Sequence, residues 1–140
     1  MKYQELIKEV EGVGKLELSE QEEFYRNVLN ESSNDLEVMV AATFYLGMAY
    51  YYEGDFKKSK EIIEPIILRY QSMPFVRELI SAFNLMGVML YYDGANVSSR
   101  YYYEKALQIA MEHEDVGHYC YEYNLSLIHI SEPTRQEAIS

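Results

Sequence analysis

Apolar residues recur along this chain at the spacing of three to four residues that gives a helix one buried face. Near the N-terminus, Leu6, Ile7 and Val10 form such a stripe, which Gly12 and Gly14 end. Continued along the chain, the pattern predicts helices at about 3–12, 19–34, 35–53, 55–70, 72–92 and 96–113, and a seventh beginning near residue 116. The sequence therefore predicts an all-α fold.

Polar residues and prolines indicate where these helices begin and bend. Ser19, followed three residues later by Glu22, forms a capping-box pattern for the second helix. Ser72 is suited to cap the fifth helix, with Pro74 in its first turn. Pro65 falls inside the fourth helix, where it removes one amide donor, so we expect a kink there.

Two stretches forty residues apart have nearly the same sequence: LGMAYYYEG at 46–54 and MGVMLYYDG at 86–94. The correspondence extends further, since Ala82 pairs with Ala42 at the same offset. A fixed period of this length is typical of repeat proteins, in which each unit buries its apolar face against the next. Because stacked repeats expose a long surface, the pattern favours a binding protein over an enzyme.

Two glycines recur in register inside predicted helices. Gly47 and Gly87 lie in mid-helix, where glycine costs about 1 kcal/mol relative to alanine. A cost repeated in both copies indicates a close approach of two helix backbones. Ser59 and Ser99 are the small residues that we expect to face these glycines from the second helix of each copy.

The two copies match the signature of a known repeat family. The tetratricopeptide pattern W-x2-L-G-x2-Y, followed by A-x3-F, has its counterparts at Leu46, Gly47, Tyr50 and Ser59 in the first copy, and at Met86, Gly87 and Ser99, followed by Ala106, in the second. Residues 38–124 therefore resemble the tetratricopeptide-repeat family. The resemblance implies antiparallel helix pairs stacked as an α-solenoid. The chain departs from the pattern in having no Trp, Ser in place of Ala, and a period of forty residues instead of about 34.

Gly54 and Gly94 stand where that family turns between its paired helices. Each follows an acidic residue at the end of an apolar run, as the residue after a helix C-terminus commonly does. We expect these glycines, like the two in mid-helix, to be structural.

The pattern and the resemblance divide the chain into five parts. They are an N-terminal helix pair (1–34), a first repeat (35–71), a second repeat (72–115), the start of a third (116–124) and a tail (125–140). The helix pair is either a degenerate repeat or a cap. The third copy is indicated by Tyr123 and Asn124, which match Phe83 and Asn84.

The repeat register breaks at Leu127, where a third copy needs a small residue. Residues 125–135 read LSLIHISEPTR, which resembles the in-frame translation of a transposase-type sequencing adapter. The alternative is a divergent native tail. We therefore expect the natural protein to continue past Asn124 with more repeats, and we assign the tail no function.

Charge and composition exclude several classes of function. The formal net charge is −11, from 12 basic and 23 acidic residues, and no basic stripe offsets it, so we predict no binding to nucleic acid or to an anionic membrane. The single cysteine, Cys120, allows no internal disulfide and favours a reducing compartment. The N-terminus lacks the apolar core of a signal peptide, and no apolar run reaches the roughly 18 residues of a membrane span. We expect a cytoplasmic protein.

One cluster carries metal-binding residue types: His113, Glu114, Asp115, His118 and Cys120. Its spacing is irregular, whereas zinc sites use short ligand pairs at set separations. We predict no metal, and we expect His113 to lie at the negative C-terminal end of the sixth helix.

Catalytic patterns are also missing from the sequence. No glycine-rich phosphate motif occurs. Cys120 and His118 are two residues apart, so on a helix their side chains point in different directions. We predict no catalytic residue, no cofactor and no enzymatic activity within these residues.

The tetratricopeptide resemblance implies a ligand groove along the inner face of each first helix. In this sequence the inner-face places fall at Ala41, Phe44, Met48, Tyr51 and Tyr52 in the first copy, and at Ser81, Asn84, Val88, Tyr91 and Tyr92 in the second. Tyr and Met offer adaptable contact area, and the Asn84 amide is suited to bind a peptide backbone. The alternative is that the four tyrosines pack against neighbouring helices, as we expect of Tyr50 and Tyr103.

Two functions follow from this surface. The first is a module that binds a protein or peptide segment in its concave face. No basic residue occupies the groove places, so the clamp for a C-terminal carboxylate found in some members of the family is not supported. The second is the N-terminal sensory or regulatory region of a larger bacterial signalling protein, such as a diguanylate cyclase, with the catalytic domain beyond Asn124. The identity of the partner and the oligomeric state are not predicted.

Overall fold

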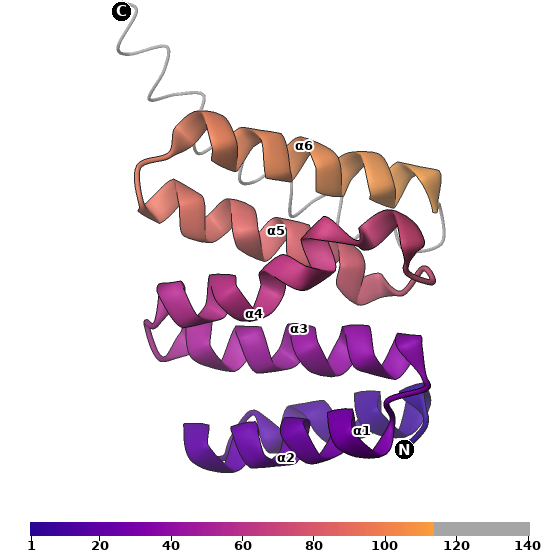
Figure 1. Ribbon diagram of the computed structural model, residues 1–140. Coiled ribbons are helices and arrows are strands. Elements are labelled where there is room, and N and C mark those ends of the chain that lie inside the picture. The colour runs from indigo at the N-terminus through magenta and orange to yellow at the C-terminus, as the bar shows by residue number, and fades with distance from the viewer. Residues whose placement is uncertain (114–140) are drawn as a thin grey trace, which may run out of the picture. The chain divides into compact units, whose positions relative to one another are not determined.

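The computed structural model describes residues 1–113, and every regular element among them is a helix (Figure 1). The elements are α1 (Tyr3–Val13), α2 (Leu18–Glu31), α3 (Leu36–Tyr52), α4 (Phe56–Leu68), the short 3-10 helix η1 (Tyr70–Ser72), α5 (Arg77–Tyr92) and α6 (Asn96–Glu112). The predicted all-α class is confirmed for these residues. None of these helices is both long and apolar enough to cross a membrane.

The chain forms two compact units, residues 1–79 and residues from 80 onward, here called the N-terminal and C-terminal units. In the N-terminal unit, α3 lies between α2 and α4 and also contacts α1 (Figure 1). Its apolar core includes Leu6 from α1, Tyr25 and Val28 from α2, and Val38 and Leu46 from α3. Of the predicted stripe on α1, Leu6 is fully buried, whereas Ile7 and Val10 are half-buried.

A serine and a glycine join α3 to α4. The Ser59 hydroxyl is fully buried and donates a 2.6 Å hydrogen bond to the backbone carbonyl of Gly47. A Cβ atom at Gly47 would lie 2.5 Å from Cδ1 and 2.7 Å from Cγ1 of Ile63. Glycine is therefore needed because the Ile63 side chain occupies the space where a larger residue would project.

The C-terminal unit repeats the same contact between α5 and α6. The Ser99 hydroxyl donates a 2.7 Å hydrogen bond to the carbonyl of Gly87. A Cβ atom at Gly87 would lie 2.5 Å from Cε1 of the buried Tyr103 ring. The expectation that each serine faces its glycine is confirmed in both copies, and we call this arrangement the Gly–Ser contact.

The turns between the paired helices use the two remaining repeat glycines. Gly54 has φ +83° and Gly94 has φ +81°, a left-handed conformation that only glycine adopts readily. The amide of Gly54 donates to the Tyr51 carbonyl, and the amide of Gly94 donates to the Tyr91 carbonyl. Each lies two residues after the last helical residue, at the C′ position, as predicted.

Two predicted helix caps are wrong. α2 begins at Leu18 after an extended Glu17, and no side chain caps it, so Ser19 lies inside the helix. α5 begins at Arg77, whereas Ser72 belongs to η1, where its hydroxyl donates to the Arg69 carbonyl. A residue before proline is forced out of the helical region, and Met73, before Pro74, has φ −93° and ψ 147°. Ser72 therefore has no helical residue after it to cap.

Other boundaries are closer to the prediction. Asp35 caps α3 by accepting a 3.3 Å hydrogen bond from the amide of Val38. α2 ends at Glu31, three residues before the predicted end, and α4 continues through Pro65 to Leu68. The predicted seventh helix, the third repeat copy and the tail lie outside the described residues.

Candidate binding surface

The predicted groove residues of α3 change from buried to exposed along the helix. Phe44 is only 3% exposed, Met48 and Tyr51 are half-buried, and Tyr52 is 77% exposed. Ala41, at the other end of the series, is fully buried. Only the C-terminal end of this face is therefore open to a ligand.

An aromatic cluster stands at that open end. The Tyr51 ring stacks on Phe56 of α4, with ring centroids 5.3 Å apart and an interplanar angle of 12°. The Tyr52 ring packs edge-on against the Tyr51 ring, with ring centroids 5.4 Å apart. This arrangement supports the Tyr52 ring from one side and leaves most of its surface to solvent.

α5 shows the same gradient. Asn84 and Val88 are buried, Tyr91 is half-buried, and Tyr92 is 65% exposed and lies edge-on to Tyr91 at 5.9 Å. The spacing of these four residues places them on one face of the helix. Ser81, one turn before Asn84, is half-buried.

Asn84 has an unusual environment for an amide. The side chain is 5% exposed, and its carbonyl oxygen Oδ1 accepts no hydrogen bond. Leaving a buried acceptor unpaired costs about 1–3 kcal/mol, and in folded proteins such an oxygen is usually bonded to a protein group or to an ordered water. The homologous place in the first copy carries Phe44, which has no such requirement.

The N-terminal unit contains a buried polar cluster that the sequence pattern did not indicate. Glu78, 2% exposed, accepts hydrogen bonds from the Tyr3 hydroxyl at 3.0 and 2.9 Å and from the Tyr45 hydroxyl at 3.1 Å. Tyr3 lies 75 residues away in the sequence, so no local spacing links it to Glu78. The sequence feature that favours Glu78 at this place is its position in the first turn of α5, where the helix dipole stabilises a negative charge.

Burial shifts the titration of the tyrosines in this unit. Desolvation first, and then the Glu78 carboxylate, raise the pKa of the Tyr3 and Tyr45 phenols above its ordinary range. Burial alone raises the pKa of Tyr25 to about 12. The pKa of Tyr50 is also raised, by burial and by a hydrogen bond with Glu22.

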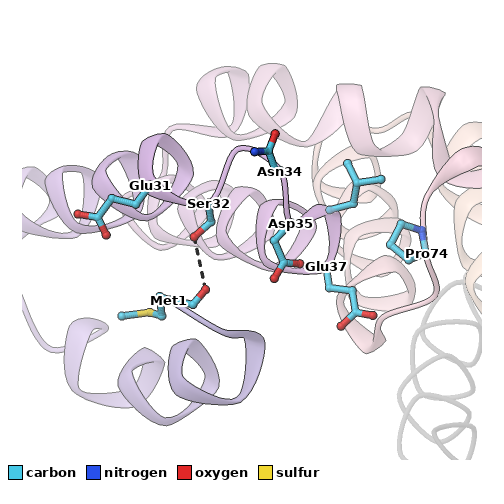
Figure 2. Close-up of a pocket in the computed structure, with 8 residues that line it drawn as sticks. Met1, Glu31, Ser32, Asn34, Asp35, Glu37 and Pro74 are labelled. Atoms are coloured by element: carbon cyan, nitrogen blue, oxygen red, sulfur yellow. Dashed lines mark hydrogen bonds between the residues drawn. The ribbon is translucent and has the colours of Figure 1, made fainter.

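An open pocket of about 570 Å³ lies elsewhere in the N-terminal unit (Figure 2). Figure 2 shows the carboxylates of Glu31, Asp35 and Glu37 spread from the end of α2 to the first turn of α3. The Ser32 hydroxyl, which also lines it, donates to the Met1 carbonyl at 3.4 Å. None of the predicted groove residues lines this pocket, and its three carboxylates would repel an anionic ligand.

Within residues 1–113, no group of three or more His, Cys, Asp and Glu side chains is placed to hold a metal ion. Of the cluster singled out in the sequence, only His113 is described, and it follows the last residue of α6 as the helix C-cap. Glu114, Asp115, His118 and Cys120 lie outside the described residues.

Comparisons of the chain with protein-family models, curated proteins and solved structures give no match.

Proposed function

We propose that this chain is a binding module that holds a protein or peptide segment on the inner face of a tetratricopeptide-like helix array. The observation that carries the proposal is the pair of exposed tyrosines, Tyr52 and Tyr92, which occupy the same place in the two repeats and each lie edge-on to a half-buried tyrosine. Large exposed aromatic rings at matching places of the two repeats suit an uncharged segment of another chain.

A peptide segment also supplies main-chain donors and acceptors in a regular array. Every residue except proline carries one N–H group, and a carboxamide can accept from it while donating to the adjacent carbonyl. Tyr52 and Tyr92 provide large, rigid contact surfaces at a low cost in side-chain entropy. Half-buried Met48 adapts its shape to different side chains.

The groove places carry no charge, so main-chain hydrogen bonds and apolar contacts supply the affinity. The ligand that suits them is an uncharged or apolar segment of a protein chain. In the alternative role, as the sensory region of a larger signalling protein, the same surface would receive the same class of ligand.

A selection from a random peptide library displayed on phage tests the proposal. Peptides that bind the full chain are synthesised and titrated by calorimetry into the unaltered protein and into Tyr52→Ala, Tyr92→Ala and Asn84→Leu. We expect each substitution to weaken binding by about tenfold, equivalent to about 1.4 kcal/mol. Leu68→Ala is the matched control, because this exposed leucine lies outside the groove places.

Melting temperatures measured on the same variants separate binding from folding. Tyr52→Ala and Tyr92→Ala should melt close to the unaltered chain, since both rings are largely exposed. A large loss of stability in both would identify the tyrosines as core residues. Selected peptides that bind all three variants with unchanged affinity would show that the groove is not the binding site.

A further inference from the structure

The exposed tyrosine of the first repeat, Tyr52, stands on a surface with few hydrogen-bond acceptors. The main-chain carbonyls of residues 49–51, which precede it on α3, accept hydrogen bonds from the amides of the turn at 53–55. Among the groove places of this repeat, the side-chain acceptors are two phenol oxygens, of Tyr51 and Tyr52, and the weakly accepting sulfur of Met48. A ligand on this face therefore meets aromatic surface and hydroxyl groups, with few acceptors for its own donors.

The second repeat closes its turn in the same way. The carbonyls of residues 89–91 accept hydrogen bonds from the amides at 93–95, and Tyr92 follows them at the end of α5, 65% exposed. Asn84 adds one carboxamide among the groove places of this repeat, but its side chain is only 5% exposed. The same shortage of acceptors around a large exposed ring thus occurs in both repeats.

Such a surface discriminates against main-chain N–H groups. An extended segment that lies on it takes N–H groups out of water, and each one left without an acceptor costs about tenfold in affinity. Proline has no N–H group to leave unpaired. The carbonyls of a proline-rich segment still need donors, and tyrosine hydroxyls supply them.

Building on the proposed function, we propose that the segment bound by the groove is rich in proline and lies on Tyr52 as a polyproline II helix. This helix has three residues per turn and no internal hydrogen bonds, and it is formed before binding, so little conformational entropy is lost. Aromatic surfaces that bind such helices are a recurrent mode of peptide recognition. The Tyr52 ring packs on the proline rings, and its hydroxyl donates to a carbonyl of the segment.

Neighbouring aromatic rings hold Tyr52 in place for this contact. The Tyr52 ring lies edge-on to the Tyr51 ring, and the Tyr51 ring stacks on Phe56 of α4. Because a ring that is already positioned loses less rotamer freedom on binding, this support raises the affinity for a rigid ligand.

Carboxylates near the ring raise one alternative, a ligand that holds a cation over the Tyr52 ring. The Asp55 carboxylate caps α4 by accepting a 3.1 Å hydrogen bond from the Lys58 amide, whereas Glu53 is exposed. A cationic ligand would gain affinity from Glu53, but a proline-rich ligand leaves that carboxylate in water. The substitution Glu53→Gln therefore separates the two ligands.

A nuclear magnetic resonance titration of the nitrogen-15-labelled full chain with decaproline, capped at both ends, tests the proposal. We expect weak binding, with a dissociation constant on the order of 100 µM, and shifted amide signals around Tyr52 and Tyr92. Two further peptides carry alanine or N-methylalanine in place of the four central prolines. Alanine restores four N–H groups and should weaken binding by at least about tenfold, whereas N-methylalanine has no N–H group and should stay within about threefold of decaproline.

Variants of the protein locate the contact. Tyr52→Phe keeps the ring and removes the hydroxyl, so it should weaken decaproline binding about fivefold. Tyr52→Ala removes both and should weaken binding by at least about tenfold. Glu53→Gln and Leu68→Ala should leave the affinity unaltered. Circular dichroism verifies that each variant remains helical.

An alanine peptide that binds as tightly as decaproline overturns the proposal, as does a decaproline affinity that Tyr52→Ala leaves unchanged or that Glu53→Gln lowers. Decaproline that does not bind, alongside proline-free peptides from the phage selection that lose affinity in Tyr52→Ala, overturns the preference for proline and leaves the binding function standing. If no selected peptide depends on Tyr52 or Tyr92, the binding function itself fails.

Discussion

The two repeats share their internal contact and differ in their outward surfaces. In both, a buried serine donates to the carbonyl of a mid-helix glycine, and a side chain four residues after the serine fills the space above that glycine. That side chain is Ile63 in the first repeat and Tyr103 in the second. The comparison separates what holds a helix pair together from what is free to vary for binding.

The largest expected effect comes from breaking the shared contact. Gly87→Leu places a side chain where the Tyr103 ring already lies, and the ring cannot leave without exposing a buried core. We expect this variant to lose the cooperative thermal unfolding of α5 and α6, as followed by hydrogen exchange of their amides. Gly47→Leu should do the same to α3 and α4.

Gly12→Leu is the control for these two variants. A Cβ atom at Gly12 meets nothing within 4 Å, so a leucine there should stabilise α1 by up to about 1 kcal/mol through helix propensity. If Gly87→Leu folded as well as Gly12→Leu, close packing at the glycine would not be what pairs α5 with α6.

Much of this shared contact was predictable from the sequence, and the reason is physical. A mid-helix glycine lowers helix stability unless a neighbouring helix needs the space. The recurrence of Gly47 and Gly87 in register therefore indicated a close contact with the second helix of each copy, where Ser59 and Ser99 are the small residues. The start of α5 was missed because Pro74 restrains Met73 more strongly than Ser72 can favour a cap. The Glu78 cluster was missed because its partners are brought together only by the folded chain.

Exposure along the groove faces was likewise hidden from the sequence. The spacing placed Asn84 and Tyr92 on one face but could not show that one is buried and the other open. An unpaired carbonyl oxygen is a property of the packed structure, since it depends on what surrounds the amide. The expectation of Tyr103 as a core residue is confirmed, whereas Tyr50 is only half-buried.

Alkaline pH should unfold the N-terminal unit. The pKa values of Tyr3, Tyr25 and Tyr45 are raised in the folded chain, above about 10 for an exposed tyrosine. Their contribution to stability is therefore complete below pH about 10 and is lost as the pH rises toward and beyond about 12, because the unfolded chain releases these protons first.

Absorbance at the tyrosinate band, recorded together with circular dichroism, measures this effect. A late step of tyrosine ionisation should coincide with loss of helix. Tyrosines that all ionise near pH 10 while the helices persist would contradict the burial of these three phenols.

Glu78→Gln should destabilise the N-terminal unit by about 1.5–3 kcal/mol, the range for hydrogen bonds to a charged group. Glutamine keeps the shape of the side chain but replaces one carboxylate oxygen with an amide donor and removes the negative charge that strengthens the hydrogen bonds from both phenols. The second repeat has Leu85 where the first has Tyr45, so the described part of the C-terminal unit should be unaffected.

Urea unfolding measures this loss, and Tyr45→Phe provides the comparison because it removes one bond to the same carboxylate. The variant with both Glu78→Gln and Tyr45→Phe should lose less unfolding free energy than the sum of the two separate losses, since both substitutions act on one cluster. Strict additivity would mean that Glu78 and Tyr45 do not interact.

The smallest effect has the opposite sign. Asn84→Leu removes the unpaired carbonyl oxygen and should raise the free energy of unfolding by about 1 kcal/mol, the lower end of the cost of a buried unpaired group. The same change should weaken binding of a selected peptide. A stabilised protein with impaired binding is what a residue kept for its ligand would give, whereas a clear loss of stability would show that the Asn84 carbonyl is satisfied within the fold.

The most direct test of peptide binding by the repeat face is hydrogen exchange of the full chain with and without a selected peptide. We expect protection to rise at the C-terminal turns of α3 and α5, around Tyr52 and Tyr92, and to be unchanged at Glu31 to Glu37, which line the acidic pocket. Protection confined to that pocket, with Tyr52 and Tyr92 unaffected, would contradict the proposed function.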